Sequence, residues 1–182
     1  MKNLIKNVAL VLGDKQSFLC LENDDEELTT EISTYVTLAN FVIKDIAANF
    51  QCFVAEEKIL SNAESKINLE QLSHQPCTIK KIKNFFDKSI NYSVLVDQIV
   101  VPTANEQYVI EYTYFPFDAE LESDIELPLG LDRTTICYGI VSEYYKLKMM
   151  FAESDVWEQK FKSRLRLLIK RFSGKFFMFR GL

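Results

Sequence analysis

The chain of 182 residues has one histidine, five glycines and four cysteines, and these low numbers exclude several kinds of site. Nucleophile–histidine catalysis could use only His74, whose place between Ser73 and Pro76 predicts a surface loop. The cysteines lie far apart and form no Cys-x-x-Cys pair, which predicts reduced, mostly buried thiols and not a zinc site. The glycines are scattered, so no loop pattern that could cradle a phosphate is present.

Long apolar runs are also missing. No stretch approaches the roughly 20 apolar residues of a membrane span. The first thirteen residues lack the apolar region and the small-residue cleavage site of a signal peptide, and unpaired thiols fit a reducing cytosol. The net charge of −5 argues against a general nucleic-acid binder.

The length and the ordinary globular composition predict one domain over residues 1–172, followed by a basic, aromatic tail over residues 173–182. Apolar residues at helical spacing predict a short helix that ends at Gly13 and a long helix over residues 26–50. The acidic patch from Glu22 to Glu27 suits the first turn of the long helix, with Asn23 or Asp24 as its cap.

The middle of the chain is rich in β-branched and aromatic residues, and it predicts antiparallel strands arranged as a meander. The expected strands cover residues 53–60, 78–86, 90–101 and 108–115. The second of them also fits a helix by its spacing. Polar turns separate the strands, and prolines bound the last two, where a missing hydrogen-bond donor does least harm.

Two further helices are expected after the strands, one capped by Asp132 and one capped by Ser154. A short link makes them antiparallel neighbours. Gly139 lies inside the first of them, which suggests close approach of another helix. The sequence therefore predicts an α+β fold in which helices flank an antiparallel β-meander, with a C-terminal two-helix unit and a short tail.

Charge is distributed unevenly along the last third of the chain. Acids dominate residues 118–132, whereas bases dominate from residue 156 onward. The acids Glu120, Glu122, Asp124 and Glu126 have a spacing that would gather carboxylates on one side of an extended segment. Such a row could hold a divalent cation and serve a hydrolase, but a solvated or partner-facing segment is the favoured interpretation. No metal or cofactor is predicted.

The basic end leaves two interpretations open. Cations interleaved with aromatic rings suit single-stranded nucleic acid, so a small nucleic-acid-binding accessory protein is the alternative function. A solvated basic face on an ordinary helix is the simpler interpretation. The run Phe176–Phe179 should dock on the parent domain or, as we favour, on another chain, because it would otherwise expose four large apolar side chains. The predicted partner-binding residues on the basic side are Arg164, Arg166, Arg171, Lys175, Phe176, Phe177 and Phe179.

Several local patterns resemble the head–tail connector proteins of tailed phages, which are also called adaptor or head-completion proteins. The matching segments are Val109–Pro116, Leu121–Leu127 with Pro128 and Arg133, Tyr138–Tyr145, and Met149–Phe151 with Trp157. The helix expected over residues 26–50 is similar to the first major helix of that family. The chain departs from the family pattern at residues 146–149. Family members often have a glycine after the first C-terminal helix, and this chain has none at these positions.

The resemblance implies a structural subunit without enzymatic activity. Family members form rings, commonly of twelve subunits, that dock below the portal protein and support downstream neck or tail proteins. DNA passes through the channel of such a ring without sequence-specific binding, and no membrane is involved. The expected location is the virion neck at the head–tail junction, after assembly in the host cytoplasm. Ring contacts are heterologous, so opposite charges on two faces of one subunit would suit them.

Overall fold

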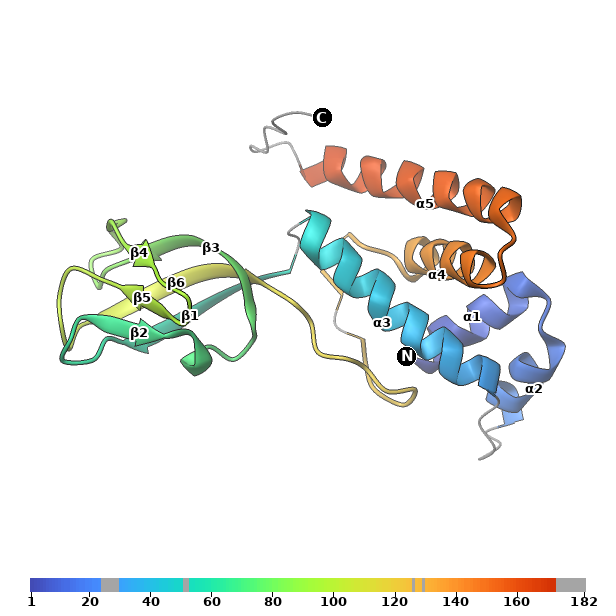
Figure 1. Ribbon diagram of the computed structural model, residues 1–182, viewed down its shortest axis with the longest axis horizontal. Helices are drawn as coiled ribbons and strands as arrows, with labels where there is room; N and C mark the ends of the chain where they lie inside the picture. Colours follow the sequence, from blue (N-terminus) through green and yellow to red (C-terminus); the bar gives the residue numbers. More distant parts are fainter. Residues whose placement is uncertain (24–29, 51–52, 126, 129, 173–182) are drawn as a thin grey trace. The chain divides into compact units, whose positions relative to one another are not determined.

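The computed structural model describes residues 1–23, 30–50, 53–125, 127–128 and 130–172, with side chains up to residue 167. The chain forms two compact units (Figure 1). The helical unit combines Met1–Ile43 with Asp118–Leu182, and the β-unit consists of Lys44–Phe117. The α+β class is confirmed, as are the antiparallel strand pairing and the C-terminal two-helix unit. The single domain over residues 1–172 stays a prediction, and the tail at 173–182 lies outside the described residues.

The helical unit begins with two short helices, α1 (Lys2–Leu12) and α2 (Lys15–Asn23). Gly13 ends α1 with a positive φ of 73°, a backbone conformation that suits glycine. Asp14 then accepts a hydrogen bond of 3.1 Å from the backbone N–H of Ser17 and so starts α2. Helix α2 was not predicted, because the acidic patch at residues 22–27 was assigned to the first turn of the long helix. Of that patch only Glu22 and Asn23 lie within the described part of the chain, and both belong to α2.

Helix α3 (Thr30–Phe50) confirms the long helix, and the expected positions 26–29 lie outside the described residues. Its buried residues recur at intervals of three and four, as an amphipathic helix requires. Tyr35 is one of them, and its hydroxyl donates a hydrogen bond of 3.0 Å to Asp14. Asn23 ends α2 and does not cap α3, whereas Asp24 lies outside the described residues.

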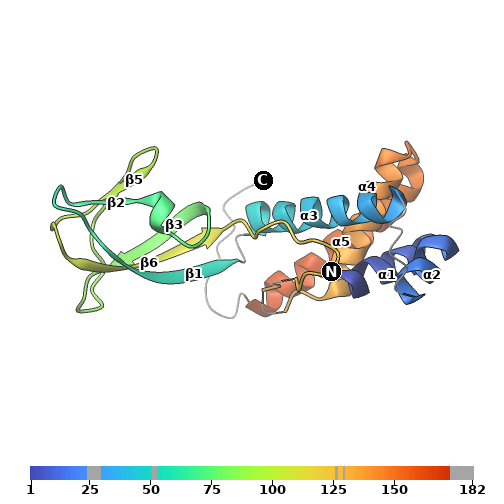
Figure 2. The same ribbon diagram turned by 90° about the horizontal axis from the view of Figure 1, so that it is seen from below.

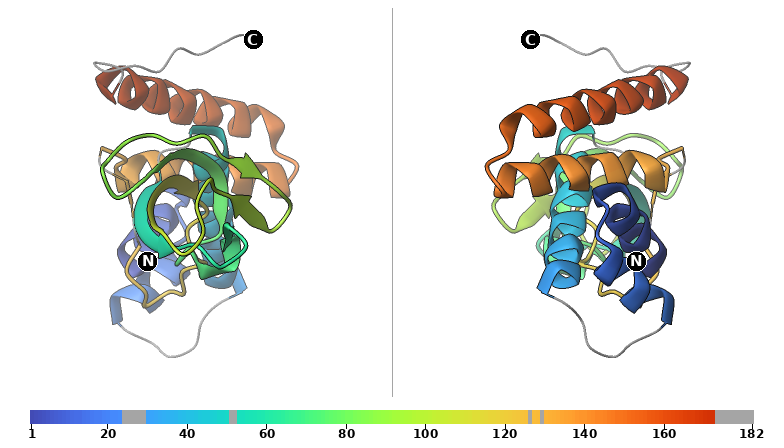
Figure 3. Two further views of the ribbon diagram at one scale, coloured as in Figure 1. Left: turned by 90° about the vertical axis from the view of Figure 1, so that its left-hand side faces the viewer. Right: turned by 90° about the vertical axis from the view of Figure 1, so that its right-hand side faces the viewer.

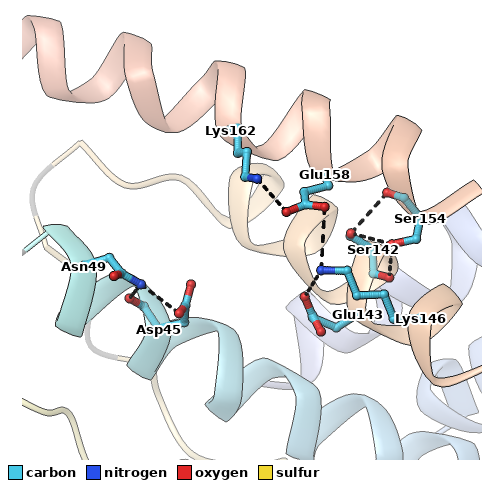
Figure 4. A network of polar contacts seen from close by, with 8 residues as sticks. All are labelled: Asp45, Asn49, Ser142, Glu143, Lys146, Ser154, Glu158 and Lys162. Carbon is cyan, nitrogen blue, oxygen red and sulfur yellow. Dashed lines mark hydrogen bonds and ion pairs between the residues drawn. The ribbon is translucent and has the colours of Figure 1, made fainter. Parts of the chain in front are cut away.

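Helices α4 (Arg133–Leu147) and α5 (Phe151–Phe172) lie side by side (Figure 3). Asp132 caps α4 as predicted. The predicted cap at Ser154 is wrong, because α5 begins three residues earlier. The Ser154 hydroxyl is buried and donates to the carbonyl of Ser142 at 3.0 Å, so it joins two helices and starts neither (Figure 4).

The β-unit contains two three-stranded antiparallel sheets. The strands β1, β6 and β3 of one sheet lie side by side (Figure 2). One sheet has the order β1-β6-β3 and the other the order β2-β5-β4. The strands are β1 (Val54–Leu60), β2 (Lys66–Asn68), β3 (Pro76–Lys83), β4 (Ser93–Val94), β5 (Gln98–Val100) and β6 (Gln107–Tyr114). The strand β6 lies between the first expected strand and the second, so neighbours in this sheet are not successive in the chain.

Two strand predictions need adjustment. The segment at 78–86 is a strand and not a helix, but it ends at Lys83 and leaves Phe85 and Phe86 in a turn. The segment at 90–101 divides into β4 and β5, because the backbone N–H of Leu95 bonds to the carbonyl of Gln98 at 2.8 Å and reverses the chain. Side chains alternate along β6 as predicted, and Tyr108, Ile110, Tyr112 and Tyr114 are buried.

Candidate partner-binding surfaces

The acidic segment is fixed to the helical unit by its backbone. The amide of Asn40 in α3 forms a reciprocal pair with Ala119, donating to its carbonyl at 3.0 Å and accepting from its N–H at 3.0 Å. The N–H of Lys2 donates to the carbonyl of Leu121 at 2.8 Å, and the Met1 nitrogen donates to the carbonyl of Ser123. The segment therefore has a defined course along α1 and α3.

The side chains of Glu120, Glu122 and Asp124 are exposed, whereas Glu126 lies outside the described residues. A turn interrupts the expected extended course, because the N–H of Ser123 bonds to the carbonyl of Glu120 at 3.1 Å. Among the described residues no group of three acidic, histidine or cysteine side chains could hold a metal ion. The exposed acids form a negative surface supported by a fixed backbone.

On the basic side, Arg164 contacts residues of its own chain. Its guanidinium lies 3.1 Å from a carboxylate oxygen of Asp132, and its carbon is 5.3 Å from the ring centroid of Tyr138. Arg166, two positions further along α5, is exposed. Arg171 belongs to α5, but its side chain is not described, and Lys175, Phe176, Phe177 and Phe179 lie outside the described residues.

The carboxylate of Asp132 has three favourable partners. It accepts hydrogen bonds from the N–H and hydroxyl of Thr135 at 2.6 and 2.8 Å, besides the contact with Arg164. Partial burial raises the pKa of Asp132, but these hydrogen bonds and the guanidinium outweigh burial and hold the pKa below its ordinary value of 3.8. The ionised form is therefore favoured in the folded chain.

We expect Asp132→Ala to lower the stability of α4 by about 1–2 kcal/mol at pH 7, because the helix loses its N-cap. Asp132→Asn keeps a capping oxygen and should lose less. A carboxyl whose pKa is lowered by folding stabilises the folded state above about pH 5, and this contribution disappears as the pH falls through the lowered pKa. The difference between the wild type and Asp132→Asn should therefore shrink between pH 5 and 3.

Hydrogen exchange of the α4 amides, measured at pH 7 and between pH 5 and 3, reports both effects. Equal protection of the wild type and Asp132→Ala at pH 7 would show that this carboxylate does not cap the helix. A difference from Asp132→Asn that stays constant on acidification would show that the charge of Asp132 plays no part.

Bases of α4 and α5 also form ion pairs with acids of the same chain. Lys162 lies 2.7 Å from Glu158, and Lys146 contacts both Glu143 at 2.9 Å and Glu158 at 3.7 Å (Figure 4). The hydrogen bond from Lys162 lowers the pKa of Glu158; partial burial opposes it, and Lys146 adds to it. These ion pairs neutralise part of the basic face that was considered for nucleic acid.

Trp157 also belongs to the packing between α4 and α5. Its ring is half-buried, with its centroid 5.4 Å from that of Tyr138. The ammonium of Lys160 lies 3.8 Å from the indole centroid, a cation–π contact. Trp157 is therefore engaged in packing and is not a free anchor for a partner.

The turn between α4 and α5 has an apolar surface that the sequence analysis did not identify. Four large apolar side chains are exposed in five successive residues, and we call them the turn patch: Leu147, Met149, Met150 and Phe151. Met149 is 79% exposed and Phe151 is 64% exposed. The signal in the sequence was a methionine-rich run between two amphipathic helices, without the glycine, proline, asparagine or aspartate that is usual in turns.

The backbone of this turn is well defined. The N–H groups of Lys148, Met149 and Met150 bond to the carbonyls of Tyr144, Lys146 and Tyr145 at 3.0, 2.9 and 2.9 Å respectively. Met149 has a φ of 58°, a left-handed conformation that costs roughly 1–2 kcal/mol for a residue with a Cβ. Glycine would adopt it without that cost. The methionine side chain gains little burial within its own chain, because most of its surface is exposed.

The β-unit presents a second exposed apolar turn. Phe85 and Phe86 are 73% and 72% exposed at the tip that follows β3. The side-chain oxygen of Asn84 accepts from the N–H groups of Phe86 and Lys88 at 3.1 and 3.0 Å, and Lys83 pairs with Asp87 at 2.8 Å. The rings are therefore carried on an ordered turn.

His74 lies in a loop, as predicted, but its ring is half-buried. Its centroid is 4.1 Å from the ring of Tyr114 and 5.4 Å from that of Phe117. The adjacent hydroxyl of Ser73 donates to Glu57 at 3.0 Å and not to the imidazole. Tyr112 also donates to Glu57. This arrangement suits packing of the loop against β1 and β6.

The described cysteines are free thiols: Cys20, Cys77 and Cys137. Burial raises the pKa of Cys137 to about 11 and also raises the pKa of Cys77, so neither thiol is activated as a nucleophile at neutral pH. The fourth, Cys52, lies outside the described residues.

No helix in the described part of the chain is long and apolar enough to cross a membrane. Comparison with protein-family models finds no matching family, and comparison with curated proteins finds no matching sequence. The function therefore has to be inferred from the chain's own side chains and from the surfaces they form.

Proposed function

We propose that this chain is a structural subunit of a phage head–tail connector ring, which docks below the portal and joins the capsid to the tail around the DNA channel. The observation that carries the proposal is the turn patch, in which large apolar side chains are exposed to solvent on a turn with a defined backbone. Surfaces of this kind are typical of protein–protein contacts.

The energetics favour use of the turn patch by a partner. Burying a side chain such as that of Met149 or Phe151 is worth roughly 1.5–3 kcal/mol. A partner would gain this energy with little loss of backbone freedom, because three hydrogen bonds already fix the turn. The strained backbone at Met149 supports the same conclusion, because glycine would suit the turn better if the side chain had no use.

The charges of the subunit suit a ring. In a cyclic assembly one face of a subunit meets a different face of its neighbour, so the two faces need to be complementary. The exposed acids of residues 118–124 could supply one face, and Arg166 with the basic end of α5 another. Exposed ion pairs are worth only about 0–1 kcal/mol each, so they would set the register while apolar contacts supply the affinity.

The family resemblance indicates which partners such contacts would have. The Tyr138–Gly139 pair that contributes to the resemblance lies where α4 meets α3 and α5, which connects the pattern to the packing of the helical unit. As a connector, the ring would bind the portal on one side and neck or tail proteins on the other, in the virion neck. DNA would pass through it without sequence-specific contacts.

The nucleic-acid alternative has weaker support. Lys162 and Arg164 are paired with acids of the same subunit, and Lys160 lies over Trp157. A protein that binds phosphates needs cations that are free to release counterions. Salt-dependent binding of DNA by the isolated chain, lost on charge reversal at Arg164, Arg166, Lys170 and Arg171, would favour this alternative.

The test is native mass spectrometry of the full-length chain with the portal protein of the same phage. We expect a complex in which several copies of the chain bind one portal ring, and we expect Met149→Gly with Phe151→Ser to weaken it. The absence of any complex, together with the absence of a ring in either state, would count decisively against a connector role.

A further inference from the structure

Two exposed acids follow the turn patch in the chain. Glu153 and Asp155, in the first turns of α5, are exposed and follow the patch directly in the chain. Lys148 is the one base within the patch, and its ammonium lies 5.2 Å from the ring centroid of Tyr144, so it is engaged within the subunit. The turn patch is therefore an apolar surface with acids at its helical end.

The C-terminal sequence is complementary to that surface. Four apolar residues, Phe176–Phe179, stand between the bases Lys175 and Arg180. Three phenylalanines can bury roughly 150–250 Å² each. Together they approach the roughly 800 Å² that each partner buries in a stable protein–protein contact. Aromatic and methionine side chains are also those that protein interfaces favour.

The apolar run Phe176–Phe179 is too close in the chain to the end of α5 to cover the turn patch of its own copy. Helix α5 begins at Phe151, beside the patch, and ends at Phe172. At 1.5 Å per residue these two ends are about 32 Å apart. Four to five residues of extended chain span at most about 18 Å, so Phe176 and Phe177 fall well short of the patch.

We propose that the segment Phe176–Phe179 of one copy docks on the turn patch of a second copy, with Lys175 and Arg180 near Glu153 and Asp155. The proposal deepens the connector function and rests on it. The turn patch includes the first residue of α5, and the donor segment follows its last residue in the chain, so each copy can give one contact and receive one. Such a heterologous contact closes into a ring when its rotation allows closure.

The experiment uses full-length chains in sedimentation velocity and native mass spectrometry over a range of concentrations. The turn variant carries Met149→Gly and Phe151→Ser, and glycine suits the positive φ at residue 149, so this variant should fold. The tail variant carries Phe176→Ser, Phe177→Ser and Phe179→Ser. We expect each to weaken self-association by at least about tenfold. Leu19→Ser, an exposed site on α2, should leave association unchanged.

Mixing the two variants is the decisive measurement. Each retains the half of the contact that the other lacks, so a mixture should form a heterodimer and no larger species. Glu153→Lys with Asp155→Lys should weaken association, and combining them with Lys175→Glu and Arg180→Glu should restore it.

Three outcomes would refute the proposed contact between copies. They are a tail variant that associates like the wild type, folded variants that do not complement one another, and a wild type that stays monomeric at high micromolar concentration. Portal binding by the full-length chain is measured separately. Complementing variants without portal binding would refute the connector role alone, and portal binding without complementation would refute only the contact between copies.

Discussion

Replacing Ile110 with alanine is expected to lower the free energy of unfolding of the β-unit by about 2–5 kcal/mol. Ile110 is fully buried in β6, the central strand of its sheet. It lies opposite Glu57 of β1 and Ile82 of β3. Truncation leaves a cavity where two strand pairings meet, and neither neighbouring strand can close it without shifting its register. Hydrogen exchange of the β1, β3 and β6 amides measures the loss.

The matched control is Val109→Ala at the adjacent position. Val109 points to the other face of β6 and is half-buried, so its truncation should cost less than about 1 kcal/mol. Both variants alter one aliphatic residue of the same strand, and they differ chiefly in the face that they affect. A similar loss at both positions would show that β6 is held by its pairing and not by packing on one face.

Local patterns in the sequence predicted much of this fold. The alternation of apolar and polar residues along β6, the helical spacing in α1 and α4, the stop at Gly13 and the cap at Asp132 all depend on residues within a few positions of one another. Each of these features is set by local backbone geometry, so it can be recognised without knowledge of the tertiary structure.

Contacts between residues far apart in the chain could not be predicted from local sequence patterns. The pairing of β1 with β6 joins residues about fifty positions apart, and no local pattern specifies it. Ser154 illustrates a different difficulty, because serine before an apolar run is typical of a helix cap. Here its hydroxyl bonds across to α4, and only the packing of the two helices reveals that role.

Some of the candidate surfaces could be predicted from the sequence and others could not. Runs of charge are visible in the sequence. The exposure of Glu120, Glu122 and Asp124 could be expected, because burying an unpaired carboxylate costs free energy. Exposed apolar residues are harder to find, because Met149 and Phe151 would be assigned to a core by composition alone. Whether Arg164 is available to a partner also depends on Asp132, which is 32 positions away in the chain.

Gly139→Ala is expected to destabilise the helical unit by about 1–3 kcal/mol, although alanine is the better helix former by up to about 1 kcal/mol. A Cβ at this position would lie 2.7 Å from Cγ1 of Val42 in α3 and 3.1 Å from Cε2 of Phe161 in α5. Val42 is buried, and a β-branched side chain in a helix has essentially one rotamer, so it cannot turn aside. Three helices would have to move apart.

Val42→Ala supplies the matched test, because it removes the atom that meets the new Cβ. Alone it should destabilise the unit by leaving a cavity, but with Gly139→Ala the methyl group would fill part of that space. The double variant should therefore lose less stability than the sum of the two single variants, with a coupling of roughly 0.5–3 kcal/mol. Urea unfolding followed by helical circular dichroism measures all four proteins. Additive losses would mean that Gly139 is not required by the approach of α3, and the glycine of the Tyr138–Gly139 pair would need another explanation.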